Sequence, residues 1–107
     1  MSEDNFQIME MKGLLEAPGM NRSLEYFRVE FWALADFLQR NGLTTRVLAK
    51  TAEDIKEDFT IFSNDMTSEG LKFMRLAFYK WLDKIDGTDK RDDVSYLEKQ
   101  LKKLRGQ

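Results

Sequence analysis

The sequence predicts an all-α protein, a compact bundle of about four to five helices that leaves room for a minor short hairpin in the middle. Apolar residues recur at alternating steps of three and four along two long stretches, which is the spacing of one face of an α-helix. Only six glycines and one proline occur in 107 residues, which favours long regular elements over a turn-rich β architecture. The length is typical of one domain, so residues 1–107 are expected to form a single helical domain.

The first segment, residues 3–16, is open to two interpretations. Phe6 and Met9 share a helical face, whereas Phe6 and Ile8 alternate as they would in a strand. We favour a short helix. It has to end before Pro18, because proline disfavours a helical conformation in the residue that precedes it.

The second segment is the clearest helix of the chain. Its apolar residues keep the helical spacing throughout: Leu24, Phe27, Phe31, Leu34 and Leu38. Asn21 or Ser23 can cap its first turn with a side-chain oxygen. Asn41 and Gly42 form a favourable C-terminal cap.

The middle of the chain, residues 43–66, is the least regular part. Thr51 is expected to cap a short helix over residues 52–58. Residues 59–62 have the composition of a strand. They pair with residues near Thr45 in one interpretation, as a minor hairpin, and pack as an apolar plug beneath a loop in the other.

Two further helices are expected in the C-terminal part. Thr67 is a good N-cap for the first, and Asp86 with Gly87 ends it. Its apolar residues repeat the same spacing: Leu71, Met74, Phe78, Trp81 and Ile85. The last helix is expected to be capped by Asp92 and to run to about Leu104.

The composition bears on chemistry as well as on fold. The chain has no histidine and no cysteine, so the usual proton shuttle, the thiol nucleophile and the common zinc ligands are all missing. We therefore expect no enzyme, no cofactor and no metal site. The absence of cysteine, an acidic start without a signal peptide and the lack of a long apolar run favour a cytoplasmic protein.

The charge is unevenly distributed. Residues 51–70 carry six acidic side chains and one lysine, a net charge of −5 within a total of −2. On a helix, Glu53 with Glu57 and Asp54 with Asp58 would form i,i+4 pairs. The cluster is open to three interpretations: a solvated face, a surface for a basic partner, or a site for a hard cation. The candidate partner-binding residues are Glu53, Asp54, Glu57, Asp58, Asp65, Glu69, Tyr26 and Trp32.

These features favour a small protein that binds and neutralises or regulates another protein. Its sharpest form is an immunity protein or antitoxin-like neutraliser of a bacterial toxin, with a basic toxin or nuclease domain as partner. Exposed aromatic residues among Tyr26, Trp32, Tyr79 and Trp81 would be the first candidates for interface hot spots. One alternative is a homo-oligomeric structural module. Another is a nucleic-acid-associated regulator, although a pI near 5.2 argues against it; it would use Lys99, Lys102, Lys103 and Arg105.

Overall fold

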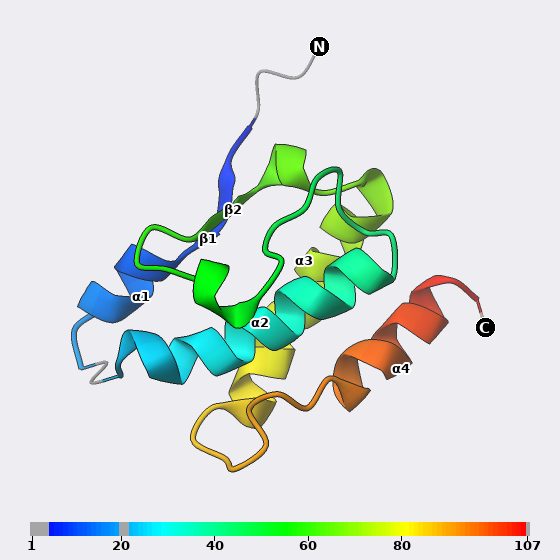
Figure 1. The fold of residues 1–107 in the computed structure, drawn as a ribbon. Coiled ribbons are helices and arrows are strands. Elements are labelled where there is room, and N and C mark those ends of the chain that lie inside the picture. Colours follow the sequence, from blue (N-terminus) through cyan, green and yellow to red (C-terminus); the bar gives the residue numbers. More distant parts are fainter. Residues whose placement is uncertain (1–4, 20–21, 107) are drawn as a thin grey trace.

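The protein is described by a computed structural model that covers residues 5–19 and 22–106. These residues form four α-helices and two short strands, in the order β1 (Gln7–Glu10), α1 (Met11–Glu16), α2 (Leu24–Arg40), β2 (Thr60–Phe62), α3 (Ser68–Ile85) and α4 (Ser95–Leu104). In Figure 1, α2 and α3 cross at the centre, with α4 on one side and the strands on the other. The described part of the chain is mostly helical, as expected, but it is not all-α because the two strands pair.

The second helix follows its sequence pattern closely. The Ser23 hydroxyl accepts a hydrogen bond of 3.1 Å from the backbone N–H of Tyr26, which confirms one predicted cap of α2. The alternative cap, Asn21, lies outside the described residues. After Asn41, Gly42 has a φ of 68°, a left-handed conformation that glycine adopts without steric strain. The buried face of α2 consists of Phe27, Glu30, Phe31, Leu34, Ala35, Phe37 and Leu38.

The third helix is anchored at both ends. The Thr67 hydroxyl accepts the backbone N–H of Gly70 at 3.0 Å, as its predicted role as N-cap requires. Gly70 lies so close to the carbonyl of Leu43 that an added Cβ would overlap that oxygen. Near the other end, the indole N–H of the fully buried Trp81 donates to the carbonyl of Asp93 at 2.8 Å. Together these contacts fix α3 against the segment after α2 and the segment before α4.

The two strands form an antiparallel sheet between distant parts of the sequence. Met9 lies opposite Ile61 and Glu10 opposite Thr60, with an irregularity between Gln7 and Met9. The expected helix over residues 3–16 is therefore wrong for residues 7–10, which form β1, and α1 begins only at Met11. Residues 3 and 4 lie outside the described residues. Residues 7–10 adopt a strand because β2 supplies backbone hydrogen-bond partners, and the local spacing of apolar residues does not reveal such partners.

Of the two interpretations of residues 59–62, the hairpin with residues near Thr45 is wrong in its pairing. Residues 59–62 pair with β1, and Thr44 instead forms an isolated bridge with Met66. The backbone N–H of Thr45 donates to the carbonyl of Asp65 at 2.8 Å. The residues near Thr45 thus run antiparallel to the segment that follows β2.

The predicted helix over residues 52–58 is reduced to one 3-10 turn, Ala52–Asp54. The turn ends at Ile55, which has an extended backbone conformation. The side chain of Ile55 is completely buried. The Ile55 carbonyl accepts a hydrogen bond of 2.9 Å from Nε of Arg28 on α2. This tertiary contact accounts for the early end of the helical turn.

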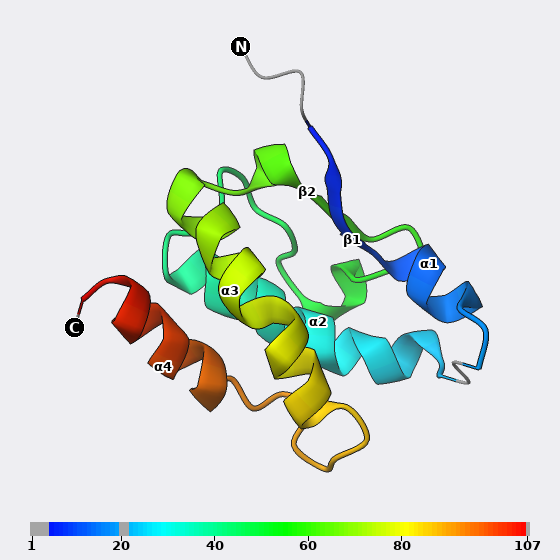
Figure 2. The ribbon, with the colours of Figure 1, turned by 180° about the vertical axis from the view of Figure 1, so that it is seen from behind.

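The last helix begins at Ser95, three residues after the predicted cap Asp92. The carboxylate of Asp93 accepts the backbone N–H of Ser95 at 2.9 Å, while its carbonyl is held by the Trp81 indole. Leu97 and Leu101 are buried, and α4 lies beside α3 in both ribbon views (Figures 1 and 2). In the described residues, no helix is long and apolar enough to cross a membrane.

Candidate functional site

Several carboxylates of residues 51–70 are engaged within the fold. Asp65 is only 8% exposed, and its oxygens accept hydrogen bonds from the Arg46 guanidinium at 2.7 and 3.2 Å. The backbone N–H of Phe62 adds a third bond at 2.9 Å. Burial raises the pKa of Asp65, but the bonds from Arg46 and Phe62 outweigh burial and hold this pKa below its ordinary value.

Glu69 and Asp54 are also hydrogen-bonded within the chain. The Arg105 guanidinium donates to both oxygens of Glu69 at 2.8 and 2.9 Å, which lowers the pKa of Glu69. Oδ2 of Asp54 accepts the backbone N–H groups of Lys50 at 2.8 Å and Thr51 at 3.1 Å, which lower the pKa of Asp54. These two candidate residues thus stabilise a helix pair and a turn.

Three candidate carboxylates, Glu53, Glu57 and Asp58, are exposed, and we call them the acidic loop. The predicted i,i+4 pairing of Glu53 with Glu57, and of Asp54 with Asp58, is wrong because the helical turn ends at Asp54. Lys56 is also exposed within the loop. The exposed negative surface is therefore smaller than the net charge of residues 51–70 suggests. It lies on a loop rather than on a helix face.

Tyr26 joins the start of α2 to the end of α3. Its hydroxyl donates to Oδ1 of Asp86 at 2.7 Å and accepts the backbone N–H of Gly87 at 2.7 Å. The guanidinium groups of Arg22 and Arg91 lie 4.5 and 4.0 Å from the centre of its ring. Burial and the bond to Asp86 raise the pKa of Tyr26, so the phenol remains a donor at neutral pH.

Glu30 is a functional candidate that the sequence analysis did not single out. Its side chain is 1% exposed, and its Oε2 has no hydrogen-bond partner among the described residues. Burial, followed by the nearby negative charge of Asp86, raises the pKa of Glu30 to about 7, while Arg91 and Arg22 act in the opposite direction. A signal was present in the sequence, since position 30 falls on the apolar face of α2.

A surface pocket of about 160 Å³ opens over Glu30. Glu30 lines this pocket although its side chain is almost completely buried. The walls are mostly apolar, and the exposed Asp83 and Asp86 add negative charge at the rim. The remaining lining residues described are Leu14, Phe27, Phe31, Tyr79 and Leu82.

This pocket is one of three adjoining pockets, which together we call the α3 groove. The other two, of about 290 and 180 Å³, lie between α3 and residues 6–14. All three include Tyr79, and neighbouring pockets also share Leu14 and Leu82 or Gln7 and Ile8. Figure 2 shows this side of the molecule, with β1 and α1 on one side of α3 and α4 on the other.

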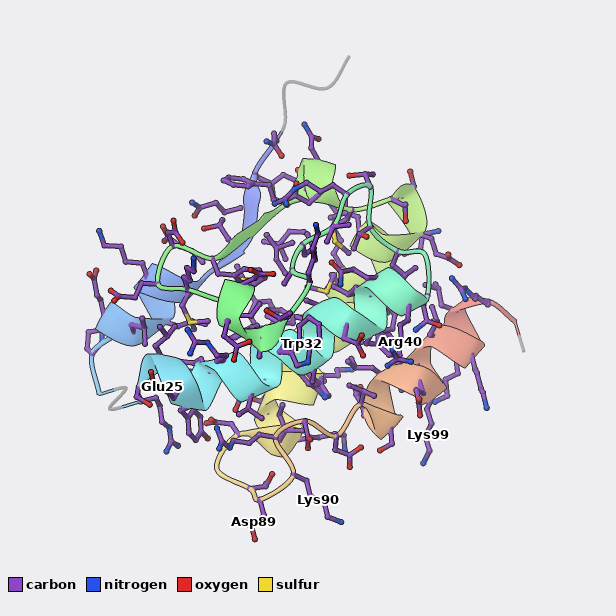
Figure 3. The ribbon with its side chains drawn as sticks, viewed as in Figure 1. Glu25, Trp32, Arg40, Asp89, Lys90 and Lys99 are labelled. Atoms are coloured by element: carbon purple, nitrogen blue, oxygen red, sulfur yellow. The ribbon has the colours of Figure 1, made fainter. Side chains whose placement is uncertain are left out.

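The aromatic candidates differ sharply in exposure. Tyr79 is 68% exposed at the centre of the α3 groove, whereas Trp81 on the same helix is fully buried. Trp32 is half-buried near the middle of α2 (Figure 3). Of these residues, Tyr79 has the exposure that an interface hot spot needs before a partner arrives.

The basic side chains near the C-terminus also differ in their surroundings. Lys99, Lys102 and Lys103 are exposed on α4, and Lys99 points away from the molecule in Figure 3. Arg105 is held by Glu69 and also donates to the carbonyl of Asn41 at 2.9 Å. Three of the four predicted nucleic-acid contacts are thus surface lysines, and the fourth braces α4 against α3.

In the described ranges, no group of three or more acidic side chains is placed to hold a metal ion. Comparison with known proteins finds no significant match to a family model, to a curated protein or to a solved structure. Any assignment of function therefore depends on the residues and their geometry.

Proposed function

We propose that this chain is a small protein-binding inhibitor or regulator, in its sharpest form an immunity protein or antitoxin-like neutraliser of a toxin. The partner is another protein with a basic surface, and the expected compartment is the cytoplasm. The observation that carries the proposal is the α3 groove, an apolar furrow with the exposed Tyr79 at its centre and carboxylates at one end. Apolar furrows with a central aromatic residue and a charged rim are typical of protein interfaces.

The acidic loop gives the proposal a second source of support. Glu53, Glu57 and Asp58 are exposed close together in sequence, so they generate a local negative potential. Such a potential steers a basic partner and speeds its association, even where the charges add little affinity. The groove would then supply the lasting contacts and the loop the initial attraction.

Site-specific photo-crosslinking in the native host tests the proposal. A photoreactive amino acid replaces Tyr79 in one variant and Leu76 in a control, because Leu76 is also exposed on α3 but does not line the groove. We expect a defined crosslinked protein from position 79 and little from position 76. The purified partner should then form a stoichiometric complex with the chain, and its own activity should fall in that complex.

Two outcomes would overturn the proposal. The first is the absence of any crosslinked partner that reconstitutes a complex from purified components. The second is a crosslink to another copy of the same chain, which would instead support the homo-oligomeric module.

A further inference from the structure

We infer that the α3 groove binds an extended segment of a partner protein, which adds to the free edge of β1 and places a lysine or arginine side chain against Glu30. This inference rests on the proposed protein-binding function and specifies the part of the partner that is recognised. Three independent features of the groove support it: an unpaired strand edge, a matching length and a one-sided charge.

The strand edge comes first. In the described part of the chain β1 pairs only with β2, so its opposite edge has no strand partner. All four residues of β1 border the central pocket of the groove. Successive side chains of a strand point to opposite faces, so a pocket bordered by four consecutive residues adjoins the edge between the two faces. Backbone groups at such an edge can pair with an added strand, a common mode of peptide recognition.

The length of the groove also suits an extended peptide. On α3 its lining extends from Leu71 to Asp86, which at 1.5 Å per residue is about 22 Å. An extended chain rises by about 3.3 Å per residue, so a segment of about seven residues would span the groove. A short peptide segment is therefore enough to contact all three pockets.

The charge of the groove differs between its ends. At one end the lining is apolar around Phe6 and Leu71, with Arg75 as its cation. At the other end the pocket is lined by the exposed Asp83 and Asp86 and by the buried Glu30, and the guanidinium of Arg22 lies 3.7 Å from a carboxylate oxygen of Asp86. An apolar segment that ends in a basic side chain is complementary to this arrangement.

Glu30 gives the basic side chain a defined destination. An ammonium or guanidinium group would donate the hydrogen bond that Oε2 of Glu30 lacks among the described residues. This carboxylate is already removed from water in the folded protein, so the free-energy cost of its desolvation belongs mainly to folding rather than to binding. The apolar walls around Phe27 and Leu82 would accommodate the aliphatic stem of the same side chain.

Selection from a random heptapeptide library displayed on phage tests this inference directly. The selection uses the whole chain at pH 8, where Glu30 is ionised because its pKa is about 7. We expect the enriched peptides to contain alternating apolar residues and one lysine or arginine near an end. The best peptide is then synthesised with its basic residue either kept or replaced by norleucine, which keeps the stem without the charge.

Binding of both peptides is measured by fluorescence anisotropy to the wild-type chain and to Glu30→Gln. We expect the charged peptide to bind Glu30→Gln about tenfold more weakly than it binds the wild type. The norleucine peptide should bind both proteins about tenfold more weakly than the charged peptide binds the wild type. Glu25→Gln is the matched control, since Glu25 is an exposed carboxylate on the same helix outside the groove. It should bind the charged peptide like the wild type.

Amide chemical shifts locate the peptide. The shifts of Ile8, Glu10 and Tyr79 should move on binding, and those of the acidic loop should not. Failure to select any binder, enrichment without basic residues, equal affinity for Glu30→Gln, or shifts confined to another surface would each overturn the inference. If a host partner still crosslinks or reconstitutes while these peptide results fail, the proposed function stands and the extended-segment inference falls.

Discussion

The phenol of Tyr26 donates a hydrogen bond of 2.7 Å to Oδ1 of Asp86, sixty residues further along the chain. The same oxygen of Tyr26 accepts the backbone N–H of Gly87. Asp86 lies at the C-terminal end of α3, and its negative charge helps to raise the pKa of the buried Glu30. The contact therefore links the start of α2, the end of α3 and the acidic end of the α3 groove.

Replacing Tyr26 with phenylalanine should destabilise the protein by about 1 kcal/mol, because two hydrogen bonds are lost while the ring and its stacking with Arg91 remain. The free energy of unfolding in urea measures the effect. Tyr79→Phe is the matched control: Tyr79 is mostly exposed, so this change should stay within about 0.5 kcal/mol. Equal stability of the two variants would show that the hydroxyl of Tyr26 contributes nothing to the connection.

Glu30 should make the protein less stable as the pH rises towards 8. Folding raises the pKa of Glu30 from 4.5 to about 7, so between these values the folded state holds a proton that the unfolded state releases. The contribution of protonated Glu30 to the free energy of unfolding is complete below pH 4.5 and is lost as the pH rises through 7. From the size of the pKa difference, this loss amounts to up to about 3 kcal/mol.

Glu30→Gln tests this pH dependence. The amide stays neutral, so the variant should lose the downward slope between pH 4.5 and 7 and should exceed the wild type in stability at pH 8. The charges that act on Glu30 come from Arg22, Arg91 and Asp86, and all three remain. Carboxylates with lowered pKa values, such as Asp65, act in the acid range below this window. A wild-type slope in Glu30→Gln urea titrations would contradict the assignment, and Glu25→Gln should keep that slope.

The long helices could be predicted from the sequence because their signals are local. The spacing of apolar residues along α2 and α3 and the caps Ser23 and Thr67 depend on residues within a few positions of one another. The pairing of β1 with β2 could not be predicted in this way. It joins Met9 to Ile61, and although residues 59–62 have the composition of a strand, nothing local identifies their partner.

The candidate site followed the same division. Net charge identified residues 51–70, but only the structure separates the exposed acidic loop from Asp65 and Glu69, which are bound within the chain. Glu30 could have been noticed, since a carboxylate on an apolar helix face is itself a signal. That Tyr79 is exposed while Trp81 is buried depends on which side of α3 the strands and α4 cover.

Gly70 should tolerate no larger side chain. An added Cβ would overlap the carbonyl oxygen of Leu43, a backbone atom that cannot move without displacing the segment after α2. Gly70→Ala should therefore destabilise the protein by at least about 2 kcal/mol, despite the higher helix propensity of alanine. Gly13→Ala is the matched control, because Gly13 is exposed on α1 and its nearest neighbour is a flexible side-chain oxygen of Glu10 at 3.4 Å. Thermal unfolding of both variants measures the contrast, and a Gly70→Ala variant as stable as the wild type would disprove the close contact.

Reversing the charge of the acidic loop should slow association with a basic partner. With Glu53, Glu57 and Asp58 changed to lysine, we expect the association rate to fall by about tenfold at low salt and its salt dependence to weaken. Asp54 is left unchanged because it caps the turn through Lys50 and Thr51. Stopped-flow or surface-binding kinetics with the partner recovered by crosslinking provide the measurement.

The control for this experiment must change the net charge by the same amount elsewhere. Glu25, Asp92 and Glu98 are exposed carboxylates scattered over α2, the α3–α4 connection and α4, so their replacement by lysine matches the total charge without touching the loop. If steering is local, this control should slow association less than the loop variant does when both are compared at 0.1 M salt, because at that salt exposed charges more than about 10 Å apart are largely screened. Equal slowing by both variants would assign the effect to net charge, and no slowing by either would remove the acidic loop from the interaction. Dissociation rates should change little in both variants, because the lasting contacts are assigned to the α3 groove.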